Sequence, residues 1–342
     1  MSWKFIKLGL VIAAALFTIS DTRLLLAQES FRGKVIRIVV GLAPGGGFDI
    51  YSRTIAKHMG KHIPGNPTIV VENMTGAASL VAANYLYNVA KPDGLTIGNF
   101  VGGIVMHELF GKPGISFHAT KFEYLGVPVQ DNYMIGLAKS TGITSVEQWK
   151  ASGKVIKFGG VGPGGGVDDL PKVVKHALGL PLQVVSGYKG TGLIRLAFNA
   201  GEVQGASLSW DSMKSTWSNE LEKGEIVVIL QETVRPHPDL PNVPVAYEMA
   251  TTEEGKKLIR AQAVICGTTN RIYALPPGTP KLLVQTLRKG FMDTLSDPEF
   301  VADAKKSKLE IDPIGGEDVE KEIKGLFNME RSLIEKLKDI LK

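Results

Sequence analysis

The chain has 342 residues, a formal net charge of +5, a charged-residue content of 21% and a hydrophobic content of 44%. These values are typical of a soluble globular protein long enough for two lobes, each with its own core. Three basic residues and one acidic residue lie within positions 1–27, which leaves a net charge of +3 for positions 28–342. That excess is small and scattered, and it does not favour nucleic acid as a partner.

Residues 1–27 have the pattern of a secretory signal peptide. Lys4 and Lys7 form a basic start, an apolar stretch covers residues 8–19, and Ala27 is a small residue in front of a polar sequence. The apolar stretch is short for a membrane span, although an uncleaved N-terminal anchor remains the alternative. We therefore predict cleavage near Ala27 and export to the periplasm. The single cysteine, Cys266, lies in an apolar run and is predicted to be a buried core thiol.

Two strands run into the same glycine-rich turn and then into an amphipathic helix. The first strand covers residues 35–40 and is followed by Pro-Gly-Gly-Gly-Phe-Asp at 44–49, here called the first glycine loop. The second covers residues 155–158 and is followed by Pro-Gly-Gly-Gly-Val-Asp at 163–168, the second glycine loop. Glycines leave backbone N–H groups unshielded, and the following helix adds the positive end of its dipole. The pattern predicts two lobes that each present an anion-binding loop to a shared cleft.

The other expected elements alternate between strand and helix. In the first half they are a helix near 50–59, a strand at 68–71, a helix near 80–87 and a strand at 95–97. In the second half they are a helix at 170–178, a strand at 182–185, a helix at 191–199, and strands at 203–209 and 225–230. This order predicts parallel sheets with helices packed on their faces.

Two segments are expected to connect the lobes. Residues 128–133 are polar and aromatic and give the first predicted crossing, and the proline-rich residues 236–244 give the second. From residue 274 onward the chain reads as helical and heavily charged. We expect this C-terminal part to pack back on the first lobe.

From residue 34 to about residue 323 the chain resembles the Bug-type substrate-binding proteins of tripartite tricarboxylate transporters. Besides the two glycine loops, the motifs that carry the resemblance are Val71-Glu72-Asn73 followed by Gly76-Ala77, and the segments 91–96, 188–191, 201–203, 240–244, 277–280 and 296–298. Each motif is short, but their order along the chain is that of the family.

The resemblance implies a type II periplasmic binding protein, an α/β fold whose two lobes each hold a mainly parallel sheet flanked by helices. Residues 28–131 would begin lobe 1, residues 132–245 would form lobe 2, and residues 246–342 would return to lobe 1. It also implies a monomeric receptor, without cofactor or metal, that closes on a small organic carboxylate. The receptor would then deliver this acid to the membrane permease subunits of the transporter.

The site residues expected from the loops, the strand ends and the resemblance are Leu42, Pro44, Gly45, Gly46, Gly47, Phe48, Thr75, Gly76, Ala77, Gly162, Gly164, Gly165, Gly166, Val167, Asp169, Tyr188, Lys189, Gly190, Thr191, Ser209 and Trp210. Most follow a strand, because ligands of parallel sheets gather at the carboxyl ends of the strands. Asp49 is instead read as a first-turn acid that suits the helix dipole.

Four of these positions depart from the family pattern. The family commonly has an aromatic residue at the position of Leu42 and a small hydroxyl residue at that of Phe48. Gly166 stands where a hydroxyl is usual, and Asp169 stands where histidine is usual. An acid beside a carboxylate pocket is unfavourable unless it is protonated, paired or turned away. An amine or amide at the far end of the ligand is therefore an open alternative.

Several segments resemble catalytic or metal-binding motifs but lack residues that those motifs require. Residues 205–209 lack the last glycine of a nucleophile elbow. His58 and His62 have a spacing that suits a metal, but Lys57 and Lys61 repel cations. The glycine loops also lack the signatures of nucleotide binding. A solute receptor is the leading hypothesis, and an exported hydrolase or lyase, or the ligand-binding module of a membrane sensor, are the alternatives.

Overall fold

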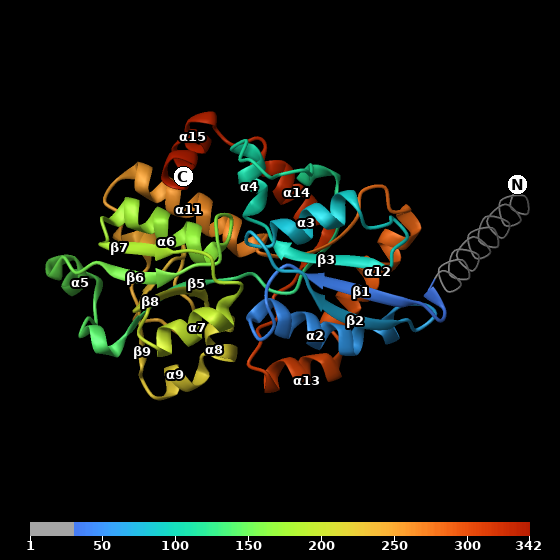
Figure 1. Cartoon of the computed structure of the whole chain (residues 1–342), viewed down its shortest axis with the longest axis horizontal. Coiled ribbons are helices and arrows are strands. Elements are labelled where there is room, and N and C mark those ends of the chain that lie inside the picture. The colour runs from blue at the N-terminus through green and yellow to red at the C-terminus, as the bar shows by residue number, and fades with distance from the viewer. Residues whose placement is uncertain (1–30) are drawn as a thin grey trace, which may run out of the picture.

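The computed structural model describes residues 31–342, so the expected signal peptide lies outside the described part of the chain. Two mixed sheets, each flanked by helices, lie side by side (Figure 1). This arrangement confirms the predicted two-lobed α/β class. Within residues 31–342, no helix is both long and apolar enough to cross a membrane.

Lobe 1 is built on a six-stranded sheet with the order β11-β4-β10-β3-β1-β2. Its strands are β1 (Val35–Val40), β2 (Thr68–Asn73), β3 (Thr96–Val101), β4 (Glu123–Val127), β10 (Arg271–Leu275) and β11 (Ile314–Gly315). Its helices are α2 (Gly47–Met59), α3 (Leu80–Asn88), α4 (Ile104–Leu109), α12 (Lys281–Leu295), α13 (Pro298–Lys306) and α14 (Gly316–Leu326). β3 and β10 are buried along their whole length and β1 is buried from Ile38 onward, so most residues of these central strands are apolar.

Lobe 2 is built on a five-stranded sheet with the order β7-β6-β8-β5-β9. Its strands are β5 (Tyr133–Ala138), β6 (Ile156–Gly159), β7 (Leu182–Val185), β8 (Gly205–Ser209) and β9 (Ile226–Gln231). The helices of this half are α5 (Val146–Ser152), α6 (Gly166–Leu178), α7 (Thr191–Asn199), α8 (Trp210–Thr216), α9 (Ser218–Glu222), α10 (Ala246–Met249) and α11 (Glu253–Thr268), and the last helix of the chain is α15 (Arg331–Ile340).

The sheets are mixed rather than mainly parallel, and the crossings between the lobes explain why. β1 pairs in parallel with β2 and β3, and β6 pairs in parallel with β7 and β8. β10 and β5 each enter a sheet directly from the other lobe, at the cleft edge, and so run antiparallel to their neighbours. The first residues of β10 and β5 therefore lie at the edge where the parallel strands end.

The second crossing lies later in the chain than predicted. The Gln231 side chain donates hydrogen bonds to the carbonyls of Leu240 and Val243 at 2.9 and 2.6 Å, which hold the proline-rich segment 236–244 on lobe 2. α10 and α11 then pack on α6, and the chain reaches the six-stranded sheet of lobe 1 only at Arg271. The expected return to lobe 1 after residue 245 is thus wrong for residues 246–268.

The C-terminal part packs on both lobes. α12 and α13 lie against α2, and α14 lies against β4, as expected for a return to lobe 1 (Figure 1). α15 packs on α6 of lobe 2 instead. Cys266 in α11 is buried, as predicted, and accepts a hydrogen bond from the Gln262 amide.

Candidate functional site

The N-termini of α2 and α6 approach one another at the cleft edge of the two sheets and enclose an inner cavity of about 20 Å³. Its lining residues are Leu42, Gly47, Phe48, Val101, Tyr133, Val161, Gly165, Gly166, Val167, Thr191, Leu208, Ser209, Ser212, Asn270 and Arg271. The space is about that of one water molecule, so the lobes are nearly closed on each other.

A second cavity of about 410 Å³ adjoins the inner one and forms the outer part of the cleft. It is lined by Leu42, Gly76, Ala77, Ala78, Val161, Gly162, Pro163, Ser186, Gly187, Tyr188 and Lys189. Leu42 and Val161 line both cavities and therefore separate them. A ligand with one small polar end and a longer body would fit this stepped shape.

Most of the predicted site residues line one of these cavities. The inner cavity takes Leu42, Gly47, Phe48, Gly165, Gly166, Val167, Thr191 and Ser209, and the outer cavity takes Leu42, Gly76, Ala77, Gly162, Tyr188 and Lys189. Pro44, Gly45, Gly46, Thr75, Gly164, Gly190, Asp169 and Trp210 line neither.

Several of the non-lining residues form direct contacts between the lobes. The Ala43 N–H donates to the Lys189 carbonyl at 2.8 Å, and a Cβ on Gly190 would lie 3.3 Å from that of Ala43. A Cβ on Gly103, at the start of α4, would lie only 2.1 Å from the Gly164 carbonyl oxygen. Glycine is therefore required at position 103 for the lobes to approach this closely.

In the first glycine loop, Asp49 in the first turn of α2 holds the backbone in place. Its carboxylate accepts hydrogen bonds from the Gly45 N–H at 3.0 Å, Arg53 Nε at 2.9 Å and Asn73 Nδ2 at 3.0 Å. Burial acts to raise the pKa of Asp49, but the bonds from Arg53, Gly45 and Asn73 outweigh it and lower that pKa. Asp49 is thus a first-turn acid, as predicted, and not a cavity residue.

In the second glycine loop, two buried acidic residues at the start of α6 accept hydrogen bonds from the loop backbone. The Gly162 N–H donates to Asp168 Oδ2 at 2.9 Å, and the Gly164 N–H donates to Asp169 Oδ2 at 3.0 Å. Burial raises the pKa of Asp168. His107 Nε2 from α4 of lobe 1 lies 3.2 Å from Asp169 Oδ2, and both side chains are buried.

Two predicted ligand-binding residues, Asp169 and Trp210, contact other protein groups instead of lining a cavity. Asp169 lines neither cavity: its Oδ2 accepts from the Gly164 N–H and lies beside His107 Nε2, while its Oδ1 is buried without a hydrogen-bond partner among the described residues. Trp210 donates its Nε1–H to Asp239 Oδ2 at 2.8 Å and packs against His237. Asp169 is thus paired, which is one of the three states that the sequence left open for it, and Trp210 lies outside both cavities although it follows a strand end.

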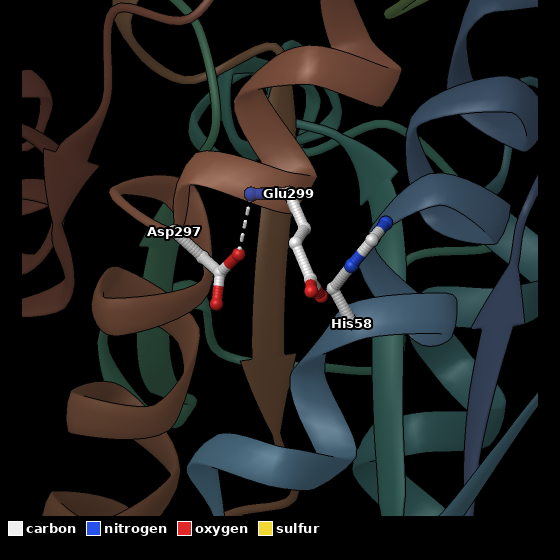
Figure 2. Close-up of side chains that lie close together, drawn as sticks. All are labelled: His58, Asp297 and Glu299. Atoms are coloured by element: carbon white, nitrogen blue, oxygen red, sulfur yellow. Dashed lines mark hydrogen bonds between the residues drawn. The ribbon is translucent and has the colours of Figure 1, made fainter.

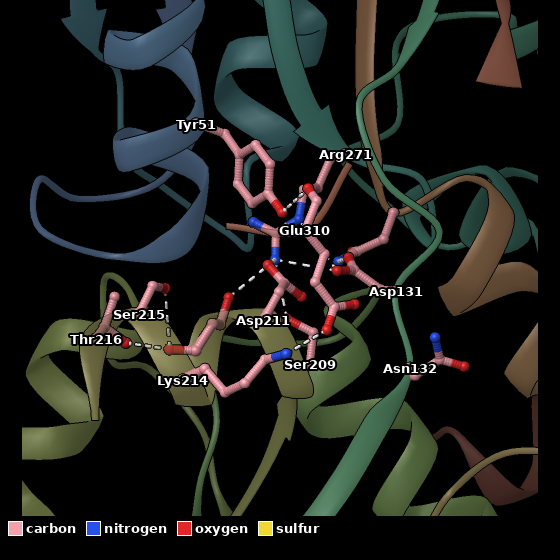
Figure 3. A network of polar contacts seen from close by, with 12 residues as sticks. Tyr51, Asp131, Asn132, Ser209, Asp211, Lys214, Ser215, Thr216, Arg271 and Glu310 are labelled. Atoms are coloured by element: carbon pink, nitrogen blue, oxygen red, sulfur yellow. Dashed lines mark hydrogen bonds and ion pairs between the residues drawn. The ribbon is translucent and has the colours of Figure 1, made fainter. Parts of the chain in front are cut away.

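Arg271, the first residue of β10, is the centre of a buried polar network between the lobes (Figure 3). It is 1% exposed, and its guanidinium pairs with Asp131 at 3.0 Å and with Asp211 at 2.9 Å. Its Cζ lies 4.6 Å from the Tyr51 ring centroid and 5.1 Å from that of Phe48. Two carboxylates thus share one guanidinium inside the protein.

The charge balance of this network affects its acids. Burial raises the pKa of Asp131, although the positive charge of Arg271 acts in the opposite direction. Asp211 adds a second buried negative charge beside the same guanidinium and raises that pKa further. Tyr133, which accepts a hydrogen bond from Asn270 Nδ2 at 2.9 Å, also has a raised pKa because it is buried.

Sequence reasoning missed Arg271, Tyr133, Asn270 and Ser212 as lining residues. Arg271 and Tyr133 begin the two antiparallel strands, β10 and β5, that cross from the other lobe. The available signal was an arginine directly before an apolar run, at residues 272–275, where a charged side chain must find partners if the strand is buried.

Acidic side chains near His58 and His62 form ion pairs that connect the C-terminal end of α2 to α13. Figure 2 shows His58, Asp297 and Glu299, and the carboxylate of Asp297 accepts hydrogen bonds from the first turn of α13. Lys61 Nζ pairs with Asp297 at 2.8 Å and with Glu299 at 2.6 Å, and His58 Nε2 lies 2.9 Å from Asp303. Because lysine already neutralises these carboxylates, the arrangement ties two helices together.

The serines of the incomplete nucleophile motif are also engaged elsewhere. Ser207 donates a hydrogen bond to Glu232, and Ser209 accepts one from Arg271 at 2.9 Å. Burial raises the pKa of Glu232 to about 8. These contacts give neither serine the histidine base that a hydrolase requires.

A model described as the tripartite tricarboxylate transporter family receptor matches residues 51–338. The chain belongs to this receptor family. It is 24% identical over 283 residues to a UPF0065 protein of Bordetella pertussis, a match that covers 80% of each protein.

Solved structures share the fold. The periplasmic binding protein BugD superposes with a TM-score of 0.73 at 22% identity, over 91% of this receptor and 98% of BugD. MatC of Rhodopseudomonas palustris with bound malate has a TM-score of 0.70 at 18% identity, covering 91% and 100% of the two chains. Rpa4515 of R. palustris with adipate has a TM-score of 0.70 at 21% identity, covering 90% and 97%.

Proposed function

We propose that this receptor acts in the periplasm as a monomer that closes on a small organic carboxylate and delivers it to transporter permease subunits, with no chemical step. One observation carries the proposal. The N-termini of α2 and α6 belong to different lobes and line the same inner cavity. Closure therefore brings two positive dipole ends and their unpaired N–H groups onto one anion.

The energies required are within reach of this geometry. Each helix terminus contributes about 0.3–2 kcal/mol to anion binding. A micromolar dissociation constant needs about 8 kcal/mol, so hydrogen bonds strengthened by the exclusion of water must supply most of the affinity. The interlobe contacts of Ala43 with Lys189 and of His107 with Asp169 stabilise the closed form in which these bonds are made.

A dicarboxylate is the ligand class that the cleft fits best. The inner cavity has room for one oxygen of a carboxylate, and the outer cavity of about 410 Å³ has room for a carbon chain and a second polar end near the exposed Lys189. Malate and adipate, the acids bound by two proteins of the same fold, are both dicarboxylates.

A thermal-shift screen of residues 28–342 tests the proposal. The panel holds succinate, malate, adipate, citrate, benzoate and the common amino acids. A ligand at a hundred times its dissociation constant adds about 2.7 kcal/mol, which raises the melting temperature by a few degrees. We expect at least one dicarboxylate to give such a shift.

A matched pair of variants shows whether the first glycine loop is the site. Gly46 is the N-cap residue of α2, so Gly46→Asp places a carboxylate on the N–H groups that the ligand needs. Gly315 is the N-cap residue of α14 and has open space around its Cα, so Gly315→Asp is the control. The proposal fails if no acid shifts the wild type, or if Gly46→Asp and Gly315→Asp respond alike.

Partner choice and assembly are tested separately. Light scattering of the mature receptor is expected to give the mass of one chain. Pull-down of the acid-loaded receptor against permease subunits and against sensor domains is expected to retain the permease. Retention by a sensor domain alone would assign the same site to signalling instead of transport.

A further inference from the structure

The two terminal nitrogens of Arg271 are used very unequally. Nη2 lies within hydrogen-bonding distance of four acceptors, namely Asp131 Oδ1, Ser209 Oγ, Asp211 Oδ2 and Ser212 Oγ, at 2.8–3.0 Å. Nη1 is buried and has no hydrogen-bond partner among the described residues. An unpaired buried donor is unfavourable, and more so when it is charged. The closed site is therefore poised for an acceptor at Nη1.

The position of Nη1 indicates where that acceptor would lie. A Cβ on Gly47 would come within 2.8 Å of Nη1, so this nitrogen faces the first turn of α2 across the bare glycine. Gly47 and Arg271 both line the inner cavity, together with Gly166 and Val167 at the start of α6. Nη1 and two helix N-termini thus face one small space.

Rigid surroundings fix this direction. Asp131 accepts from both Nε and Nη2 of Arg271, and the rings of Phe48 and Tyr51 pack near the guanidinium. Tyr51 itself is held by a hydrogen bond that its hydroxyl donates to the Glu310 carbonyl at 2.7 Å (Figure 3). Because the guanidinium is planar and its Nε–Nη2 edge is bound to Asp131, an acceptor for Nη1 would lie on the side of Gly47 and the inner cavity.

We infer that Arg271 is the specificity-determining residue of this receptor, with Nη1 donating to one oxygen of the ligand carboxylate in the inner cavity. The inference rests on the proposed function and adds the residue that selects an anion. The N–H groups at the starts of α2 and α6 then serve the remaining lone pairs of the same carboxylate. A neutral amide at this position would bring its own N–H groups against these donors.

Arg271 also joins the lobes, so the test must separate ligand contact from closure. The probe is adipate, or the panel acid that gives the largest thermal shift, together with its diamide, which has the same length and no carboxylate. Arg271→Lys keeps the charge and a donor for Asp131 and Asp211 but removes Nη1. Asp131→Asn weakens the clamp and leaves Nη1 in place.

Calorimetry is expected to show a loss of about 10- to 100-fold in acid affinity for Arg271→Lys, the range expected for a hydrogen bond to a charged group. Its diamide affinity should stay within about threefold of wild type, and Asp131→Asn should keep most of the discrimination between acid and diamide. Equal losses for acid and diamide in Arg271→Lys would show a purely structural role and overturn the inference.

A measurement on the wild-type protein tests the same inference without depending on the folding of any variant. Arg271 is the one buried arginine among the described residues, so its guanidinium signals can be recognised in ¹⁵N-arginine spectra by slow hydrogen exchange. We expect the acid, and not the diamide, to shift the Nη1 signal. An acid that binds without moving this signal would overturn the inference alone, whereas a panel with no binding acid would overturn the proposed function as well.

Discussion

In the first glycine loop the first-turn acid has its charged partner within its own lobe, whereas in the second glycine loop the buried Asp169 has a hydrogen-bonding partner across the cleft. Asp49 pairs with Arg53 on the same helix, and Asn73 of β2 supports it. Asp169 pairs with His107, which belongs to α4 of lobe 1. Both loops are held by the same type of N–H-to-carboxylate bond.

This difference has a consequence for closure. Lobe 1 can form its loop without help, because every partner of Asp49 named above lies in lobe 1. Lobe 2 gains the partner of Asp169 only when α4 approaches. We therefore expect the first glycine loop to be preformed in lobe 1 and the second to be completed when the lobes close.

The largest effect is expected from replacing one glycine by alanine in each glycine loop. A Cβ on Gly166 would lie 2.3 Å from the Tyr133 hydroxyl, within lobe 2, whereas a Cβ on Gly46 would meet Thr191 Oγ1 of the other lobe at 2.8 Å. We expect Gly166→Ala to lower the free energy of unfolding by about 1–3 kcal/mol through overpacking. Gly46→Ala should leave ligand-free stability nearly unchanged and weaken only ligand binding.

Denaturant unfolding of the ligand-free variants, followed by calorimetry with the best acid, checks this pair. Similar stability losses in Gly166→Ala and Gly46→Ala would contradict the division between a contact inside lobe 2 and a contact between lobes.

The interlobe pair gives the next effect. His107→Ala removes the lobe 1 partner of Asp169, which is present only in the closed form, so acid affinity should fall by about 10- to 100-fold while the ligand-free protein changes little. His118, which pairs with Glu108 at 3.1 Å on the surface, provides the control His118→Ala, for which we expect almost no change.

Small-angle scattering with and without acid, alongside calorimetry, measures both closure and affinity. If His107→Ala closes on the acid with wild-type affinity, the second glycine loop does not depend on lobe 1.

The first-turn acids should respond to pH with opposite signs. The pKa of Asp49 is lowered, so its contribution to stability is present above its unfolded pKa near 4 and is lost as the pH falls through the lowered value. The pKa of Asp168 is raised, so the folded state favours its protonated form and stability declines as the pH rises through that value.

Asp49→Asn is therefore expected to cost about 1–2 kcal/mol at neutral pH, the range for a hydrogen-bonded charge. Asp168→Asn should be neutral or stabilising there, because an asparagine can accept from Gly162 and donate to Ser186. Denaturant unfolding across acidic, neutral and alkaline pH gives both slopes. Destabilisation of equal size in both variants would refute the electrostatic contrast between the loops.

The smallest effect is expected at the rim of the outer cavity. Lys189 is exposed, so Lys189→Met should weaken acid binding by about threefold at most, and added salt should abolish the difference. Calorimetry at two salt concentrations measures it, with Lys154→Met as an exposed control outside the cleft. A loss that persists in high salt would mean that Lys189 contacts the ligand directly.

The sequence by itself determined the local part of this architecture. β1, β7 and α7 occupy the residues expected of them, and the strand-turn-helix order placed both glycine loops at the cleft edge. These features were predictable because hydrophobic periodicity, glycine turns and helix starts depend on residues that are close together in the chain. The family resemblance added the expectation of a carboxylate ligand and of a transporter partner.

Only the tertiary structure decided which charged groups meet. Arg271 and Tyr133 reach the inner cavity because β10 and β5 cross between lobes and run antiparallel, and the sequence reading expected no strand at either place. Asp169 meets His107, 62 residues away in the chain, across the cleft. The orientation of a buried charged group depends on the partners that surround it in space, and patterns among neighbouring residues of the sequence do not identify those partners.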